Sequence, residues 1–313
     1  MLWSFSAVHS SGPEKQELEV CLMTKSIVSK NSLTAATVRE MPIKAYLSAP
    51  GMQHSHLQHF AKSAAHFREA VDHPEKPTFA LIFGELVHTA VFEPHKLQGC
   101  YYIKPETYEN KKGEIKPWNG NATECKDWKY AHSDRPIIGK EDFDALIGIR
   151  KSVLEHPAAR RCMEKGSAEL SMFAWDPETK VLLKSRPDWT AGGVLVNLKT
   201  TEDASLEGFA RSIAKFHYDS AAAFHLDVFQ LVKPKEKDAY VFIVVEKSPP
   251  YVVGVYNLDQ ASIQIGREKY RRWLRDYVEA MESDQWPGYS DKIRTISLPM
   301  WEIRRHNTQL SLT

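Results

Sequence analysis

Hydrophobic residues recur every three or four positions in the N-terminal third of the chain, which is the spacing of one face of an α-helix. The repeat runs through residues 55–71 and again through residues 78–92, so it predicts two helices that pack against each other. Their apolar positions are Leu57, Phe60, Ala64 and Phe67, then Ala80, Phe83, Val87 and Val91. Residues 1–40 show only weak periodicity and are predicted to be a flexible arm, followed by a single folded domain over residues 41–313.

The middle of the chain alternates between irregular and periodic segments. Residues 104–136 are rich in Lys, Asn, Gly, Trp and Pro and are predicted to be an irregular insertion. A helix is expected to follow within residues 140–164 and to be interrupted at Pro157, because proline lacks the N–H that a helix interior needs. Its apolar stripe consists of Phe143, Leu146, Ile147, Ile149 and Val153.

Short apolar runs separated by turn residues predict strands from residue 168 onward. The runs "AELSMFAWD", "VLLKSRPDW" and "VLVNLKT" are separated by "DPET" and by Gly192-Gly193, which favours a three-stranded β-meander. We expect a helix over residues 206–229, capped by Ser205 or a neighbour, then two strands within residues 238–258. A long amphipathic helix over residues 260–283 precedes a final irregular segment. The pattern as a whole predicts a mixed α/β fold.

The Gly192-Gly193 pair carries the most specific prediction about chemistry. A two-residue loop there pairs residue 191 with 194 and, three steps later, places Asp188 opposite Asn197. Side chains alternate along a strand, so Lys199 shares the face of Asn197. An acid, an amide and an ammonium group would then converge. Such a site suits metal-dependent cleavage of a phosphodiester, with Asp188, Glu169 and the Leu198 carbonyl as candidate Mg²⁺ ligands.

Each candidate residue also has a structural explanation. Asp188 and Lys199 could form a solvated ion pair, although the apolar run of residues 194–196 favours a sheet covered on both faces, where polar groups need partners. His88 lies in an apolar helix and, taken alone, is more often a core residue than a ligand. Lys215 and Tyr218 are predicted on one helix face within reach of a phosphate, but core packing explains Tyr218 equally well.

The segment "REKYRRWLRDY" also allows two interpretations. Its five basic residues with interleaved aromatic residues could contact a DNA backbone, but a charged outer face over an aromatic core stripe is favoured. The basic residues are Arg267, Lys269, Arg271, Arg272 and Arg275, and the aromatic residues are Tyr270, Trp273 and Tyr277.

Composition narrows the class of protein. The formal net charge of +1 excludes a uniformly basic nucleic-acid binder but permits local patches. No apolar run approaches the length of a membrane span and no secretory signal is apparent, so a cytoplasmic location is expected. The cysteines at positions 21, 100, 125 and 162 show no CxxC spacing and are expected to be plain thiols.

An ordered set of motifs then points to a family. "FGELVHTAVFEP", "AELSMFAWDPET", "SRPDW" with "VNLKTTEDA", "WPGY" and "LPMW" resemble the phage recombination exonucleases related to exodeoxyribonuclease VIII, over residues 42–303. That family belongs to the PD-(D/E)xK superfamily. The resemblance implies a restriction-endonuclease-like core with a central mixed β-sheet flanked by helices. It also implies magnesium-dependent 5′-to-3′ digestion of linear double-stranded DNA, which leaves 3′ single-stranded tails. Mn²⁺ is expected to substitute for Mg²⁺, and the expected location is the bacterial host cytoplasm. The implied partners are a single-strand annealing protein and copies of the same chain in a ring, with a trimer favoured over a tetramer.

The resemblance assigns roles to individual residues. Asp188 matches the acid of the PD element and Lys199 the motif lysine, while His88 and Glu169 match a helix histidine and a strand acid of the metal site. Arg186, Lys215 and Tyr218 are the expected DNA contacts. The glutamine that many relatives carry three residues after the tyrosine is Ala221 here.

Asn197 is the larger departure from the family pattern, which has Asp or Glu at this position. An amide offers one neutral oxygen in place of a carboxylate, so metal affinity and rate are both expected to fall. The exchange preserves shape, as an engineered inactivating substitution would, and this origin is favoured over natural loss of activity. Two functions therefore stay open: a metal-dependent exonuclease weakened at one ligand, and a non-catalytic DNA clamp or recombination scaffold. The presence of His88, Glu169, Asp188 and Lys199 favours the exonuclease.

Overall fold

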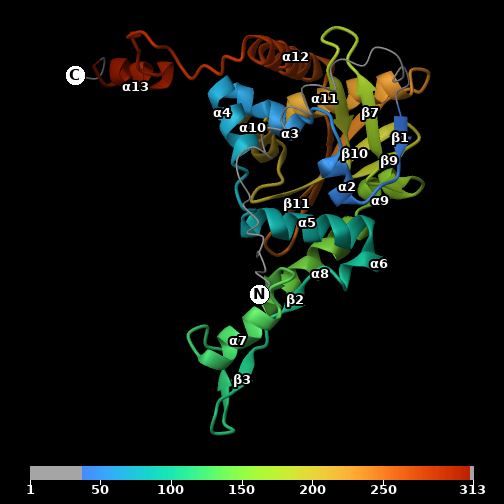
Figure 1. Ribbon diagram of the computed structural model, residues 1–313, viewed down its shortest axis with the longest axis vertical. Coiled ribbons are helices and arrows are strands. Elements are labelled where there is room, and N and C mark those ends of the chain that lie inside the picture. Colours follow the sequence, from blue (N-terminus) through green and yellow to red (C-terminus); the bar gives the residue numbers. More distant parts are fainter. Residues whose placement is uncertain (1–36, 311–313) are drawn as a thin grey trace, which may run out of the picture.

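The computed structural model describes residues 37–310, and a mixed five-stranded sheet lies at its centre (Figure 1). In spatial order the strands are β12 (Val253–Asn257), β11 (Ala239–Glu246), β10 (Val194–Thr201), β9 (Trp189–Ala191) and β6 (Ser167–Ala168). Strands β10 and β11 are parallel, and the other neighbours are antiparallel. The predicted mixed α/β fold with a central mixed sheet is confirmed.

Helices cover both faces of this sheet. Leu195 and Phe242 pack in a core cluster with helices α10 (Leu206–Phe216), α11 (Tyr218–Val232) and α12 (Gln260–Ser283). Val196 and Ile243, which alternate with them, pack in a second cluster with α5 (Phe79–Phe92) and α8 (Lys140–Glu155). Burial on both faces explains the uninterrupted apolar run of β10.

The first two predicted helices do not pack against each other. Helix α5 forms as expected, but the earlier repeat divides into short pieces: α3 (His54–Leu57), the 3₁₀ turn η1 (Gln58–Ala61) and α4 (Ala64–Asp72), after α2 (Ile43–Ser48). Leu57 and Phe67 join the α11–α12 core, whereas Phe83 and Val87 join the opposite one. The prediction of a packed pair is therefore wrong. Helical spacing reveals that one face is buried but not which partner buries it.

The predicted meander divides between two sheets. Strand β7 (Ser171–Trp175) pairs with β8 (Leu182–Ser185) and with β1 (Thr37–Arg39) in a separate three-stranded sheet. The chain then crosses residues 186–188 and enters the central sheet as β9. Pro187 has no N–H for a ladder and restricts the residue before it, which accounts for the break. Strand β1 uses three residues that the sequence places in the flexible arm, while residues 1–36 of that arm lie outside the described part of the chain.

The helix predicted over residues 206–229 is two helices. Ser205 caps α10 as expected, with its Oγ accepting a hydrogen bond from the Gly208 N–H at 3.1 Å. His217 then adopts a left-handed conformation, φ 56°, and α11 starts at Tyr218. Lys215 and Tyr218 therefore lie on different helices, so the prediction of one shared helix face is wrong.

The insertion has regular structure, contrary to prediction. Strands β2 (Tyr102–Ile103) and β5 (Ile137–Ile138) pair at its base, and the hairpin of β3 (Thr107–Glu109) with β4 (Ile115–Pro117) and helix α7 (Thr123–Ala131) project from the body (Figure 1). Elements this short leave no clear periodicity. The remaining helices are α6 (Pro94–Leu97), α9 (Pro157–Met163) and α13 (Met300–Leu310), and α9 starts at the predicted interruption.

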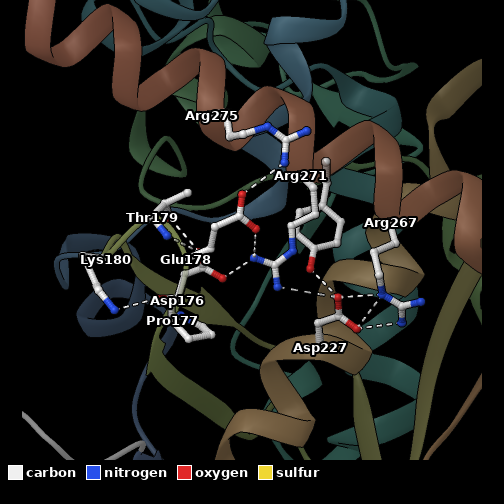
Figure 2. A network of polar contacts seen from close by, with 10 residues as sticks. Asp176, Pro177, Glu178, Thr179, Lys180, Asp227, Arg267, Arg271 and Arg275 are labelled. Atoms are coloured by element: carbon white, nitrogen blue, oxygen red, sulfur yellow. Dashed lines mark hydrogen bonds and ion pairs between the residues drawn. The ribbon is translucent and has the colours of Figure 1, made fainter.

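Three arginines of α12, Arg267, Arg271 and Arg275, contact acidic side chains (Figure 2). Arg267 binds both carboxylate oxygens of Asp227 on α11, and Arg271 donates to Asp176 in the turn after β7. The Tyr270 hydroxyl also donates to Asp227. We call Asp176, Asp227, Arg267, Tyr270 and Arg271 the α12 clamp. Tyr270 and Trp273 are buried, which confirms the aromatic core stripe, and the clamp arginines pair with protein acids.

Two sequence expectations concern compartment and thiols. Within residues 37–310 no helix is long and apolar enough to cross a membrane. Cys100, Cys125 and Cys162 are free thiols, and Cys21 lies outside the described residues.

Candidate metal centre

Three elements distant in sequence bring His88, Glu169 and Asp188 together. His88 projects from α5, Glu169 lies between β6 and β7, and Asp188 directly precedes β9. One ligand atom of each lies within 4.8 Å of the others. The hairpin explains the place of Asp188: residues 191, 190 and 189 pair with 194, 195 and 196 as predicted, and the Asp188 Oδ2 accepts a hydrogen bond from the Leu198 N–H at 2.6 Å.

Buried Asp188 pairs with the half-buried His88, with 3.3 Å between His88 Nδ1 and Asp188 Oδ1. Burial by itself raises the pKa of Asp188, but His88, Lys199 and the Leu198 N–H outweigh it and hold that pKa below its usual value. Burial likewise lowers the pKa of His88, but the Asp188 carboxylate outweighs it and raises that pKa. Asp188 is thus held as a carboxylate.

Glu169 has a different environment. Its backbone adopts a left-handed φ of 55°, and its N–H donates to the Asp188 carbonyl at 3.1 Å. Its Oε2 accepts a hydrogen bond from Arg186 Nε at 2.5 Å. Burial and the Asp188 carboxylate raise the pKa of Glu169 in spite of Arg186. A further positive charge in the site would relieve this repulsion between the two acids.

Asn197 supplies the observation that tests whether a metal ion fits. The side chain is 7% exposed, and its Oδ1 is buried without a hydrogen-bond partner among the described residues. Buried oxygens rarely lack hydrogen-bond partners. Mg²⁺ and Mn²⁺ both take oxygen ligands, and Mn²⁺ also accepts imidazole nitrogen. An unpartnered amide oxygen in the pocket that Asp188 and Glu169 also line therefore fits a divalent ion.

Lys199 lies on the same strand as Asn197, two residues further on. Burial lowers the pKa of its ammonium group, although Asp188 opposes this change. The Nζ lies 5.0 Å from the centre of the Tyr218 ring, close enough for a cation–π contact. Tyr218 therefore helps to hold the lysine at the site.

Two cavities meet at these residues. An outer cleft of about 1120 Å³ is lined by His88, Leu198 and Lys215, and an inner pocket of about 330 Å³ by Asp188 and Asn197. Glu169, Arg186, Lys199 and Tyr218 line both. The structure thus brings every predicted site residue to these cavities, while the roles of all of them, as metal ligands, catalytic groups or DNA contacts, remain predictions.

The inner pocket also contains two imidazoles that the sequence did not single out. His54 Nε2 is 2.8 Å from Ser220 Oγ, and His225 Nδ1 is 2.6 Å from Ser185 Oγ. Burial lowers the pKa of both, to about 4 for His225, so both are neutral near pH 7. They lie in "QHSHL" and "AFHLD", which match no motif. Ala221 lines this pocket too.

A buried acid directly before β9 and a lysine on the neighbouring β10, with a second acid and an imidazole beside them, form the arrangement expected of a PD-(D/E)xK site. Residues 53–299 match the family described as "PDDEXK-like domain of unknown function (DUF3799)", and the chain belongs to this family. The fold is also similar to the crystal structure of a "putative exonuclease" from Eubacterium rectale, with a TM-score of 0.55 and 12% identity over 85% of this chain and 98% of that one. No curated protein matches the chain. Membership of the PD-(D/E)xK superfamily is confirmed, and the relation to exodeoxyribonuclease VIII stays a prediction.

Proposed function

We propose that this chain is a metal-dependent exodeoxyribonuclease that digests linear double-stranded DNA and is weakened by Asn197. The observation that carries the proposal is the cluster of buried Asp188 with the half-buried His88 and Glu169, and the unpartnered Asn197 Oδ1 in the pocket beside it. The 5′-to-3′ direction, the 3′ tails, the ring oligomer with a trimer favoured, and the annealing partner rest on the family resemblance alone.

The side chains divide the work of holding a metal ion and the substrate. His88, Glu169, Asp188, Asn197 and the Leu198 carbonyl would hold a divalent ion, which neutralises phosphoryl charge and makes water a better nucleophile. The Leu198 N–H fixes one Asp188 oxygen and leaves the other directed toward His88. Lys199 is placed to orient the attacking water or to stabilise charge that develops on the phosphate.

Asn197 weakens this arrangement through charge. Asp188 and Glu169 contribute two negative charges, which the nearby Arg186 and Lys199 cations offset. A carboxylate at position 197 would add a third negative charge at an oxygen that already lacks a partner. The Asn197→Asp variant should therefore bind divalent ions more tightly and cleave faster.

The decisive experiment compares the chain with Asn197→Asp and Asn197→Ala on linear and circular duplex DNA. Mg²⁺ and Mn²⁺ are tested separately, with EDTA as the metal-free control. We expect Asn197→Asp to digest linear DNA from its ends and to leave circular DNA intact, and Asn197→Ala to remain inert. Absence of digestion by Asn197→Asp with either metal would contradict the proposal.

A non-catalytic DNA clamp is the second candidate. It is favoured by two departures from the family pattern that line one pocket, Asn197 and Ala221. A clamp would bind duplex ends in EDTA and would stay inert in the Asn197→Asp variant, so the same experiment separates the two functions.

A further inference from the structure

Arg186 occupies the connection between β8 and β9, at the boundary of the outer cleft and the inner pocket. Its side chain is only 9% exposed. The guanidinium donates from Nε to Glu169 Oε2 at 2.5 Å, and from Nη1 to Ser171 Oγ at 2.7 Å and to the Met41 carbonyl at 2.9 Å. It also lies 5.3 Å from the centre of the Tyr46 ring. Two of its three nitrogens are thus bound to the protein itself.

Glu169, which Arg186 contacts, does not belong to a strand, so strand pairing does not fix the direction of its side chain. Glu169 has a left-handed φ and lies in the gap between β6 and β7. Its remaining oxygen, Oε1, has no hydrogen bond among residues 37–310. Binding of Oε2 by Arg186 therefore determines which way Oε1 points.

The other contacts tie this carboxylate to the wall of the cleft. Met41 lies two residues before the start of α2, and Tyr46 belongs to this helix. Ile43 of α2 lines both cavities. One guanidinium thus joins Glu169 to β7, through Ser171, and to the helix that forms the rim of the site.

We propose that Arg186 is a positioning residue that aims Glu169 at the metal ion, in place of the DNA contact that the sequence predicts. The inference rests on the proposed function, because it requires Glu169 to be a metal ligand. Lysine should replace Arg186 poorly, since all three donors of an ammonium group lie on one atom, whereas the guanidinium reaches Glu169 from Nε and reaches Ser171 and Met41 from Nη1.

The neighbouring lysine provides a matched control. Lys184 is also a buried cation from β8, and its Nζ donates to the carbonyls of Tyr46, Leu47 and Ala49 at 3.1, 3.1 and 2.8 Å. It holds the same helix as Arg186 but makes no hydrogen bond to Glu169. A Lys184→Met variant thus loosens α2 without releasing the carboxylate.

The test measures binding of Mn²⁺ by electron paramagnetic resonance, in which bound and free Mn²⁺ differ, on variants whose folding has been checked by thermal melts. We expect Arg186→Lys, Arg186→Gln and Glu169→Gln each to weaken Mn²⁺ binding roughly 10- to 100-fold. The Arg186→Lys/Glu169→Gln double variant should bind no more weakly than Glu169→Gln alone, because Arg186 acts through Glu169. Lys184→Met should melt at a lower temperature but bind Mn²⁺ within about threefold of the parent, since it leaves Glu169 in place.

Three results would overturn the assignment: unchanged Mn²⁺ affinity in Arg186→Lys, additive losses in the double variant, or an equal loss in Lys184→Met. If Arg186→Gln does not fold, Arg186→Lys carries the test. Failure of the proposed function looks different, because then the parent binds no Mn²⁺ or Glu169→Gln leaves its binding unchanged. A residue that only contacted DNA would weaken end binding in EDTA when changed to Gln and leave Mn²⁺ affinity unaltered.

Discussion

The α12 clamp and the metal centre are both partly buried groups of charged residues, but their hydrogen bonding differs. In the clamp, Asp176 accepts from Arg271 at one oxygen and from the Thr179 N–H and Oγ1 at the other, and both Asp227 oxygens also have donors (Figure 2). In the metal centre, Asn197 Oδ1 has no partner among the described residues.

The pKa is lowered for Asp176 of the clamp and for Asp188 of the metal centre, and it is raised only for Glu169. Burial by itself would raise the pKa of Asp176, but the Thr179 hydrogen bonds and the Arg271 guanidinium lower it. Burial and the Asp188 carboxylate raise the pKa of Glu169 although Arg186 is bound to it. The acids of the clamp therefore have all their partners within the protein. In the metal centre, the repulsion between Glu169 and Asp188 would be relieved by a bound cation. Complete pairing indicates a structural role, and incomplete pairing indicates a binding site.

The largest expected effect is on catalysis. In an Asn197→Asp background, Lys199→Ala should reduce the cleavage rate on the order of 10³-fold, about 4 kcal/mol of activation free energy, because the ammonium stabilises developing charge. DNA affinity should fall far less than the rate, since Lys199 provides at most one of the phosphate contacts in the ground state. Single-turnover digestion and filter binding measure the two quantities. Full activity would remove Lys199 from the mechanism.

Next in size is the loss of the clamp. Asp227→Asn should lower the free energy of unfolding by about 3 kcal/mol, because it leaves buried donors of Arg267 and Tyr270 poorly matched. Glu178→Gln is the control, since this carboxylate is 54% exposed and its ion pair with Arg275 should contribute less than about 1 kcal/mol. Urea unfolding measures both. A clamp variant that lost Mn²⁺ binding without loss of stability would break the distinction between the two networks.

Metal-dependent stability should separate the parent from Asn197→Asp. A third carboxylate near Asp188 and Glu169 should destabilise the variant in EDTA, because like charges then repel. An ion that binds only the folded protein raises the free energy of unfolding by about 2.7 kcal/mol when its concentration is one hundred times its Kd. The melting temperature of the variant should therefore rise with Mg²⁺. The parent should begin higher and shift less. Equal shifts in both forms would mean that position 197 is not a ligand.

Salt dependence of DNA binding should be moderate. Lys96, Arg211 and Lys247 of the outer cleft pair with acids, whereas Lys199 and Lys215 have no ion pair among residues 37–310. Two free cations predict a log–log salt slope of about −2 and a roughly tenfold loss of affinity between 50 and 200 mM salt. Fluorescence anisotropy with an end-labelled duplex measures the slope. A slope near −6 would contradict this expectation. It would mean that the cations now paired with acids release those acids and bind DNA phosphates.

The smallest expected effect is the acid sensitivity of the clamp. Because folding lowers the pKa of Asp176, its contribution is complete above the ordinary Asp pKa and is lost as the pH falls through the lowered value. An Asp176→Asn variant should accordingly show a flatter decline in stability below about pH 4 than the parent. Urea titrations at several pH values test this expectation. Parallel declines would mean that other carboxylates dominate acid unfolding.

Local sequence determined the elements whose forces are local. The Gly192-Gly193 loop fixed the β9–β10 register, the Ser205 cap fixed the start of α10, and the apolar repeats fixed α5 and α12, because turns, caps and amphipathic faces depend on residues a few positions apart. The placement of Asp188 beside β10, with Asn197 and Lys199 on one face, followed from that register.

Only the tertiary structure decided how these elements combine. It assigned Leu57 and Phe83 to opposite faces of the sheet, divided the meander at Pro187 and brought His54 and His225 into the inner pocket. It also bound Arg186 to Glu169 and paired Arg267 and Arg271 of α12 with acids. These outcomes depend on contacts between residues 17 to 171 positions apart, from Arg186–Glu169 to His54–His225. Spacing along a chain carries no record of such contacts, because burial and charge pairing are settled only when distant segments pack together.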